Sequence, residues 1–298
     1  MPDSVTVRVP ATSANLGPGF DCLGLALDLW NEVEVRLGGP EWRVSVSGEG
    51  AGRLPDGDQN LIAAALRRYF RAHGLEAPRG GSIACRNRVP CGSGLGSSAT
   101  AAVAGLLAGA ALTGPVDMES LLPLAAELEG HADNAAAALL GGLCVSLHTP
   151  AGWTVRRFDT PALRAALVLP DFDLPTRAAR RALPDRVAHA DAVFNLGRSV
   201  LVVEALRGGD LTLLRAVMDD RLHQPYRLEL IPGARAALEA ARACGAAVAL
   251  SGAGPSLIAF CEGDPLDPAR AMQAAFSAAG LTSRTWTLAA SNRGAHLL

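Results

Sequence analysis

Residues 90–100 read P-C-G-S-G-L-G-S-S-A-T, with a glycine at every second position from 92 to 96. Three glycines in five positions allow unusual backbone angles and let the main chain approach a ligand closely. The Ala-rich run at 99–112 predicts a helix, and the unpaired N–H groups at its start carry roughly +0.5 of a charge. We therefore predict an anion site that favours phosphate. A plain glycine-rich turn capped by one of its serines is the alternative.

This loop lacks the features of three common nucleotide-binding loops. A Walker loop needs Lys after its last Gly, and the chain has no lysine, since all 27 basic residues are arginine. A dinucleotide-binding loop has the spacing G-x-G-x-x-G, whereas this one reads G-x-G-x-G-S-S. The H-R-D and D-F-G strings of protein kinases do not occur. We therefore expect the helix N-terminus to hold phosphates, with positive charge supplied by a metal ion or by arginines.

The string P-x-G-S-G-L-G-S-S-A resembles the ATP loop of the GHMP small-molecule kinases, which include galactokinase, mevalonate kinase, phosphomevalonate kinase and homoserine kinase. The motifs described below are most similar to those of the homoserine kinases. The resemblance is carried by five separate stretches of sequence, which extend from about residue 5 to residue 255. The resemblance implies that ATP contacts Pro90, Cys91, Gly92, Ser93, Gly94, Leu95, Gly96, Ser97, Ser98, Ala99 and Thr100.

Two further stretches are associated with this loop. Asn60 precedes a helix predicted from the apolar residues between 61 and 70, which fall on one helical face. Asn60 is either a cap of that helix or, as the resemblance suggests, a contact with the nucleotide base. The string S-G-A-G-P-S at 251–256 resembles the third GHMP motif, which implies that it packs beside the phosphate loop.

The N-terminal motif predicts a strand followed by a turn. Apolar and polar residues alternate at 5–9, which indicates a half-buried strand that ends at Pro10. A polar, glycine-rich turn is expected at 11–21. The string P-A-T-S-A-N-L-G-P-G-F-D resembles the first homoserine kinase motif, which implies that Asn15 and Asp21 contact the amino-acid substrate. A carboxylate at position 21 suits an ammonium group.

A second polar cluster lies between two predicted helices at 125–142, which read A-A-E-L-E-G-H-A-D-N-A-A-A-A-L-L-G-G. Polar residues at a helix start could be plain caps. The resemblance implies instead that His131 and Asn134 line the substrate pocket. Asn134 cannot act as a base at neutral pH, so phosphoryl transfer would depend on positioning, metal and dipole. Asp133 or Asp21 as the base is an open alternative.

An ATP-dependent kinase needs a carboxylate for its metal ion, and two glutamates lie just upstream of this cluster. The resemblance implies a metal-binding Glu there, with variable spacing. We favour Glu127 over Glu129, because Glu129 adjoins the glycine turn at 130. Ser98 and Glu127 are therefore predicted to lie at Mg²⁺.

Two arginine-containing strings lie in the second half of the chain. Residues 174–184 read L-P-T-R-A-A-R-R-A-L-P and residues 223–232 read H-Q-P-Y-R-L-E-L-I-P. Arginines on short helices commonly face solvent. The first string resembles the family's T-x-x-A-R-x-x-L-P motif, and the resemblance implies that Arg180 and Arg227 bind the substrate carboxylate. Two guanidinium groups suit that role, since their forked geometry matches carboxylate oxygens.

Length, composition and charge limit the class of protein. The chain has 298 residues, 49% of them hydrophobic, with a net charge of −2. This charge gives no indication of nucleic acid or a membrane as partner, and no apolar run has the length of a membrane span. The six cysteines contain no C-x-x-C pair, which favours a reduced, cytoplasmic protein.

The chain is predicted to have an α+β fold with two domains, at residues 1–160 and 161–298. The resemblance implies an N-terminal domain like domain 2 of ribosomal protein S5, a ferredoxin-like C-terminal domain, ATP between them, and a homodimer. It implies ATP-dependent phosphorylation of L-homoserine to O-phospho-L-homoserine for threonine synthesis. Alternatives are another GHMP kinase, acting on an isoprenoid or a sugar, and a non-catalytic nucleotide-binding relative. Catalytic roles are assigned to Asn134, Asp21, Ser98 and Glu127.

Overall fold

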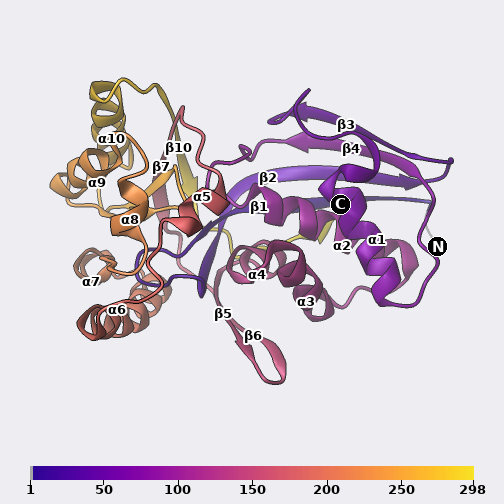
Figure 1. Ribbon diagram of the computed structural model, residues 1–298, viewed down its shortest axis with the longest axis horizontal. Coiled ribbons are helices and arrows are strands. Elements are labelled where there is room, and N and C mark those ends of the chain that lie inside the picture. The colour runs from indigo at the N-terminus through magenta and orange to yellow at the C-terminus, as the bar shows by residue number, and fades with distance from the viewer. Residues whose placement is uncertain (1–2) are drawn as a thin grey trace.

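The computed structural model describes residues 3–298, so the first two residues of the predicted N-terminal domain lie outside it. Its strands form a seven-stranded sheet and a four-stranded sheet. Figure 1 shows the two sheets side by side along the long axis of the molecule, each with its own helices. The chain crosses from the first sheet to the second after residue 158 and returns to the first sheet at its C-terminal end.

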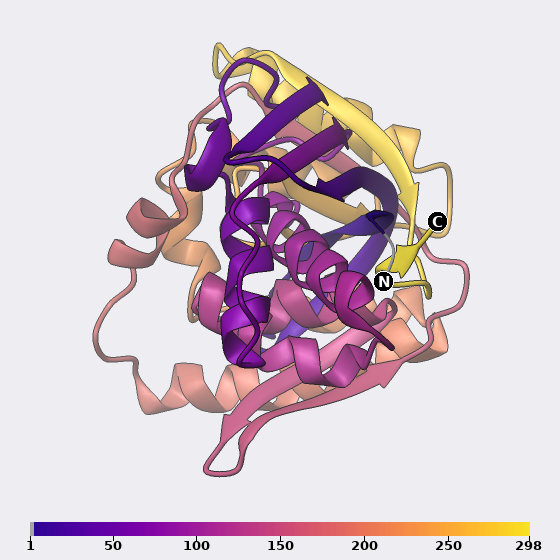
Figure 2. The same ribbon diagram turned by 90° about the vertical axis from the view of Figure 1, so that its right-hand side faces the viewer.

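In the first sheet, β11, β1, β2, β4 and β3 are neighbours in that order, while β5 pairs with β2 and β6 with β5. Helices α1 to α4 gather on one side of this sheet (Figure 2). The strands are β1 (Ser4–Ala14), β2 (Leu23–Leu37), β3 (Trp42–Gly48), β4 (Gly81–Asn87), β5 (Leu143–Thr149), β6 (Gly152–Phe158) and β11 (His296–Leu297). The helices are α1 (Leu61–Ala72), α2 (Ser97–Thr113), α3 (Met118–Glu129) and α4 (Asp133–Leu140), with a short 3₁₀ turn, η1 (Gly57–Gln59).

The second sheet has the strand order β10-β7-β9-β8, and its neighbouring strands are antiparallel. Helices connect β7 to β8 and β9 to β10, which gives the βαββαβ arrangement of ferredoxin-like domains. The strands are β7 (Arg164–Pro170), β8 (Ala247–Leu250), β9 (Leu257–Phe260) and β10 (Ser283–Ala289). The helices are α5 (Thr176–Arg181), α6 (His189–Gly208), α7 (Leu211–Val217), α8 (Gln224–Leu228), α9 (Ala234–Ala243) and α10 (Leu266–Ala278). The predicted α+β fold with two domains is confirmed.

Alternating side chains of β7 join the two domains. Because successive residues of a strand face opposite sides, Ala165 and Leu167 point one way and Val168 the other. The first pair is buried in one cluster with Leu25 and Leu95 of the N-terminal half. Val168 packs in a separate cluster with α9 and α10. The shared cluster therefore holds the second sheet against the loop that precedes α2.

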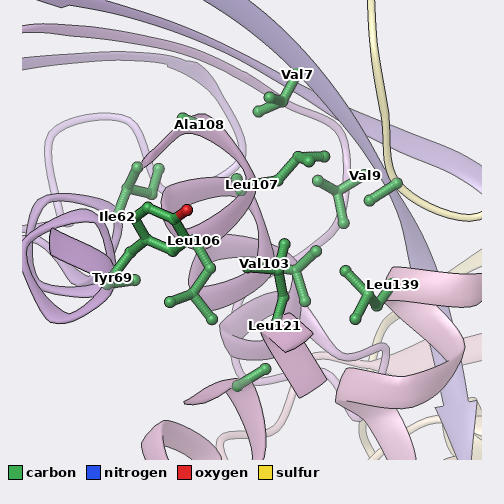
Figure 3. Close-up of a cluster of buried hydrophobic side chains, with 14 of the residues drawn as sticks. Val7, Val9, Ile62, Tyr69, Val103, Leu106, Leu107, Ala108, Leu121 and Leu139 are labelled. Carbon is green, nitrogen blue, oxygen red and sulfur yellow. The ribbon is translucent and has the colours of Figure 1, made fainter. Parts of the chain in front are cut away.

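Helix α2 forms the centre of the N-terminal core. Figure 3 shows its apolar side chains between those of α1 and β1, with Leu121 of α3 and Leu139 of α4 beside them. All residues of α2 from Ala102 to Leu112 are buried, which explains an apolar sequence with no polar face. Among the described residues, no helix combines the length and the apolar character needed to cross a bilayer.

The structure corrects the predicted end of the first strand. Strand β1 continues to Ala14, although a turn was predicted from residue 11. The register with β2 shifts between Pro10 and Ala11, so an irregularity takes up the proline and pairing then resumes. The turn itself begins at Asn15, where φ is +68°, and ends at Asp21, where φ is +55°. Asn15 therefore directly follows the end of the strand and lies at the junction of the two domains.

The contact between α1 and α2 predicts a specific effect on stability. A Cβ at Gly105 would lie 2.3 Å from the carbonyl oxygen of Ile62 and 2.8 Å from Cβ of Ala65. Since two packed helices must separate to admit it, we expect Gly105→Ala to destabilise the fold by about 1–3 kcal/mol. Urea unfolding followed by circular dichroism measures this difference.

Gly263→Ala is the matched control. An added Cβ there meets nothing within 4 Å, and alanine restricts the unfolded chain, so stability should stay equal or rise by up to about 1 kcal/mol. Equal stabilities of the two variants would contradict the close packing of α1 on α2.

Candidate active site

A cavity of about 530 Å³ lies where the two domains meet, and it receives side chains from both. Its walls are the turn after β1, the start of α1, the phosphate loop, the α3–α4 turn, α5, α8 and the loop after β8. Of the predicted site residues, the cavity is lined by Asn15, Asp21, Asn60, Cys91, Gly92, Ser93, Gly94, Gly96, Ser97, Ser98, Thr100, His131, Asn134, Arg180 and Arg227. Pro90, Leu95, Ala99 and Glu127 do not line it.

The phosphate loop has a backbone that requires glycine. Gly92, Gly94 and Gly96 have φ values of +65°, +78° and +70°. A Cβ at Gly94 would lie 2.2 Å from the Ser251 carbonyl oxygen, and one at Gly96 would lie 1.9 Å from Thr12 Oγ1. Gly96 is the residue before α2 and supplies no side-chain cap, so the first amides of this 17-residue helix are left for a ligand.

The loop after β8 packs beside the phosphate loop, as predicted. Ser251 Oγ donates to the Gly94 carbonyl at 2.8 Å, and the Ser256 amide donates to the Ser93 carbonyl at 3.3 Å. The Gly252 amide also donates to the carbonyl of Ala14, the last residue of β1, at 3.0 Å. Three segments that are distant in sequence therefore hold one another at the cavity.

Two asparagines, Asn60 and Asn31, hold the cavity wall near the starts of α1 and α2. Asn60 Oδ1 accepts from the Ile62 amide at 3.0 Å, and its Nδ2 donates to the Pro55 carbonyl at 2.9 Å. The structure thus gives Asn60 the capping role, and its contact with a base stays a prediction. Asn31 was missed, although a polar residue buried in a strand was the available signal. It donates to Thr100 Oγ1 at 3.2 Å and so ties β2 to the start of α2.

Asp21 and Arg180 come together from opposite domains. The two terminal nitrogens of Arg180 donate to the two carboxylate oxygens of Asp21 at 2.9 and 2.8 Å, which is the strong bidentate arrangement. The hydrogen bonds that Arg180 donates to Asp21 raise the pKa of Arg180. Asn15 braces the turn, because its Oδ1 accepts from the Asp21 amide at 3.0 Å and its Nδ2 donates to the Gly252 carbonyl at 2.8 Å.

Arg227 is 1% exposed and forms no ion pair with any residue between 3 and 298. Its hydrogen bonds are long and go to neutral groups, namely the Ala179 and Gly252 carbonyls, each at 3.4 Å, and His223 Nδ1 at 3.3 Å. Burial, assisted by the charge of Arg180, lowers the pKa of Arg227 to about 10. A buried charge without a counter-ion is costly, so this guanidinium is suited to an anionic ligand.

Glu129, and not Glu127, lies beside Ser98. Ser98 Oγ donates to Glu129 Oε2 at 2.6 Å, whereas Glu127 accepts from Arg68 on α1 at 2.6 Å. Residues two apart on a helix point about 200° apart, so the predicted neighbour of Ser98 faces away from the cavity. Helix α3 ends at Glu129, and Gly130 follows as its C-cap. The Glu129 side chain nevertheless lines the cavity. Burial raises the pKa of Glu129, against the hydrogen bond from Ser98, which lowers it.

His131, Asp133 and Asn134 form a connected polar group. His131 Nδ1 lies 2.7 Å from Asp133 Oδ1, and the same oxygen accepts from the Asn134 amide at 2.6 Å. Burial lowers the pKa of His131, but the hydrogen bond and charge of Asp133 outweigh it and raise the pKa overall. Thr12 Oγ1 donates to Asn134 Oδ1 at 2.7 Å. Thr12, which is fully buried, was missed because residue 12 was placed in a turn and not in a strand.

Comparisons with known proteins show which family this chain belongs to. The model of the GHMP kinase N-terminal domain matches residues 60–142, and that of the GHMP kinase C-terminal domain matches residues 202–280. The chain belongs to the GHMP kinase family. The resemblance stated from the motifs is thereby confirmed.

Proteins named homoserine kinase are among those similar to this chain. The chain is 46% identical to homoserine kinase of Synechococcus sp. (strain CC9605), over 98% of this chain and 95% of that protein. It is 44% identical to homoserine kinase of Moorella thermoacetica, over 97% and 98%. A crystal structure of homoserine kinase from Cytophaga hutchinsonii matches with a TM-score of 0.89 at 33% identity, over 100% of this chain and 98% of that one.

Proposed function

We propose that the chain transfers the γ-phosphoryl group of ATP to the hydroxyl oxygen of L-homoserine, which yields O-phospho-L-homoserine and ADP and supplies threonine synthesis. The observation that carries this proposal is the unpaired guanidinium of Arg227 in a cavity that also holds the Asp21–Arg180 pair. The names of the similar proteins support the same substrate. A sugar or a simple alcohol would leave the charge of Arg227 uncompensated.

An α-amino acid complements these three charges. Its carboxylate matches the planar fork of Arg227 and of the neighbouring Arg180. Its ammonium group matches the Asp21 carboxylate, which lies between the two domains. The acceptor hydroxyl then points toward the phosphate loop, where Asn134 offers an amide whose oxygen accepts from the buried Thr12 hydroxyl. Roles in substrate binding are thus proposed for Asn15, Asp21, His131, Asn134, Arg180 and Arg227.

The chemistry is a displacement at phosphorus. The hydroxyl oxygen forms a bond to the γ-phosphorus, the bond from that phosphorus to the bridging oxygen breaks, and its electron pair leaves with ADP. The amides at the start of α2 and of the glycine loop stabilise the negative charge of the phosphates. Asn134 orients the hydroxyl and takes no proton, so the proton passes to the transferred phosphoryl group or to water. Asp133 and Asp21 are the alternative acceptors within the cavity.

We propose Mg²⁺ as the metal ion, held by Ser98 and Glu129 in place of Ser98 and Glu127. The Ser98 hydroxyl, at the start of α2, lies 2.6 Å from the Glu129 carboxylate, at the end of α3. Oxygen atoms of this kind are the ligands that Mg²⁺ prefers. The part of the chain that the structure describes has no cluster of three His, Cys, Asp or Glu residues. Sparse protein ligation suits an ion that is bound mainly through phosphates, and this ion neutralises phosphate charge when bound.

The six free cysteines support a reducing compartment, and we propose the cytoplasm.

We also propose a homodimer. Helix α6 presents an exposed apolar stripe at helical spacing, formed by Val193, Leu196, Val200 and Leu201. The helix lies on the outside of the second domain (Figure 1). An antiparallel copy would cover the stripe and oppose the two helix dipoles.

The substrate is tested by ADP release from Mg-ATP with L-homoserine, mevalonate, galactose or no acceptor. We expect turnover with L-homoserine alone. Analogues that lack one charged group, 3-aminopropan-1-ol and 4-hydroxybutanoate, should lose about 10⁴-fold in kcat/KM, because buried polar partners are left unpaired. Preferred turnover of another acceptor would overturn the substrate, and ATP binding without turnover would favour a non-catalytic relative.

The metal ligand is tested by two isosteric variants. Glu129→Gln removes the charge beside Ser98, so we expect at least about a 10-fold to 100-fold loss of activity and a higher Mg²⁺ requirement. Glu127→Gln alters an exposed pair with Arg68 and should change kcat by less than about 2-fold. Steady-state rates across a Mg²⁺ titration separate the two. The reverse order of effects would restore Glu127 as the ligand.

The dimer is tested by sedimentation. Leu196→Arg places a charge in the α6 stripe, where a buried unpaired charge is strongly unfavourable, and should yield monomers. Leu75→Arg, at another exposed leucine next to α1, should leave the dimer intact. A monomeric unmodified protein, or a dimeric Leu196→Arg variant, would refute this interface.

A further inference from the structure

A fully buried histidine lies behind Arg227 and has no role in the reaction described above. His223 is 0% exposed, and its ring stacks on Phe20 with centroids 5.1 Å apart. The guanidinium carbon of Arg227 lies 5.1 Å from the centre of the same Phe20 ring. His223 therefore contacts the wall of the cavity without lining the cavity itself.

The partners of the imidazole determine its tautomer. His223 Nε2 lies 2.8 Å from the Gly17 carbonyl oxygen, which only accepts, so Nε2 carries the hydrogen. His223 Nδ1 lies 3.3 Å from Nη1 of Arg227, which only donates. The neutral ring therefore offers a bare Nδ1 to the guanidinium. It is the side-chain acceptor of Arg227 among the contacts described.

Burial keeps His223 neutral. Burial lowers its pKa to about 4, with Arg227 acting in the same direction and Asp220 and Asp21 opposing. A protonated ring would lose its acceptor and would place a second cation against Arg227. At neutral pH the ring therefore stays in the form that accepts from the arginine.

The position of His223 is fixed by a carboxylate at the start of α8. Asp220 accepts from the amides of His223 at 2.8 Å and of Gln224 at 2.6 Å. It also accepts from Asn195 Nδ2 on α6 at 2.7 Å. Its distance to His223 Nε2 is 3.7 Å, beyond hydrogen-bonding range, so Asp220 holds the backbone and leaves the ring to Gly17 and Arg227.

We propose that His223 is a positioning residue whose bare Nδ1 sets the direction of the Arg227 guanidinium, and thereby the preference of the cavity for an acceptor that carries a carboxylate. All three hydrogen bonds of Arg227 are long, at 3.3 Å to His223 Nδ1 and 3.4 Å to each of the Ala179 and Gly252 carbonyls, so loss of the histidine contact would leave the rotation of the guanidinium more weakly defined. This proposal rests on the proposed function, because it needs Arg227 to bind the carboxylate of the acceptor.

Two substitutions separate the two nitrogens of the ring. His223→Gln places its amide near the position of Nε2, which keeps a donor for Gly17 and removes the acceptor for Arg227. His223→Asn places its oxygen near the position of Nδ1, which keeps the acceptor and loses the contact with Gly17. Steady-state kinetics give KM for L-homoserine, KM for ATP and kcat for each variant, and thermal unfolding gives its stability.

We expect His223→Gln to raise KM for L-homoserine by about 10-fold to 100-fold, since small misplacements of a binding group have effects of this size. KM for ATP and kcat should stay within about 3-fold. His223→Asn should return KM for L-homoserine to within about 3-fold of the unmodified protein, even where its melting temperature is lower. Equal KM values in the two variants, or changes that follow stability and also affect ATP, would reduce His223 to a packing residue and overturn the proposal.

The unmodified protein separates failure of this inference from failure of the proposed function. Absence of turnover with L-homoserine would refute the function before any variant is compared. ATP binding by calorimetry establishes that each variant is folded. If His223→Gln does not fold, Asp220→Asn replaces it. That change weakens the anchor of His223, and the proposal requires the same selective rise in KM for L-homoserine.

Discussion

The site depends on the close fit of a glycine backbone between three segments of the chain. At Gly94 and Gly96 the phosphate loop passes so near to Ser251 and Thr12 that no side chain fits. This contact places the start of α2, the end of β1 and the loop after β8 around one cavity. The hydrophobic cluster shared by both sheets then fixes the domains in that relation. A kinase built in this way needs no lysine at its phosphates, because helix amides supply the positive end.

The second constraint is electrostatic. Arg227 is buried and forms no ion pair with a carboxylate of residues 3–298, and the paired charges of Asp21 and Arg180 line the same cavity. An anion that enters the cavity would offset the energetic cost of that unpaired charge, and on the proposed function this anion is the carboxylate of the acceptor. Neutral His223 and the ring of Phe20 contact the Arg227 guanidinium, and neither carries a negative charge that would neutralise it. On the proposed function, the same buried group would contribute to both the affinity for the acceptor and the choice of acceptor.

Much of this site could be predicted from sequence because each element is a short string with its own spacing. The glycine loop, the Asn15–Asp21 turn and the two arginine motifs were all identified, and all of them line one cavity. Their convergence could not be derived from spacing, since it depends on packing between residues more than 100 positions apart, such as Arg180 and Asp21.

The differences between the sequence interpretation and the structure have local physical causes. Glu127 and Glu129 are separated by two positions, so the direction of each side chain depends on the rotation of α3, which is set by its packing on α1 and α2. Strand β1 passes Pro10 by a shift of register, and a proline in a sequence reads more naturally as a strand end. The tautomer of His223 was not accessible at all, because it follows from a contact with Gly17, 206 residues away.

The most direct test of the account is a crystal structure with L-homoserine and a non-hydrolysable ATP analogue. The account predicts the amino-acid carboxylate within hydrogen-bonding distance of Arg227 and Arg180, the ammonium group at Asp21, and the hydroxyl directed at the γ-phosphate above the start of α2. An amino acid bound with its carboxylate away from Arg227, or outside the cavity, would contradict it.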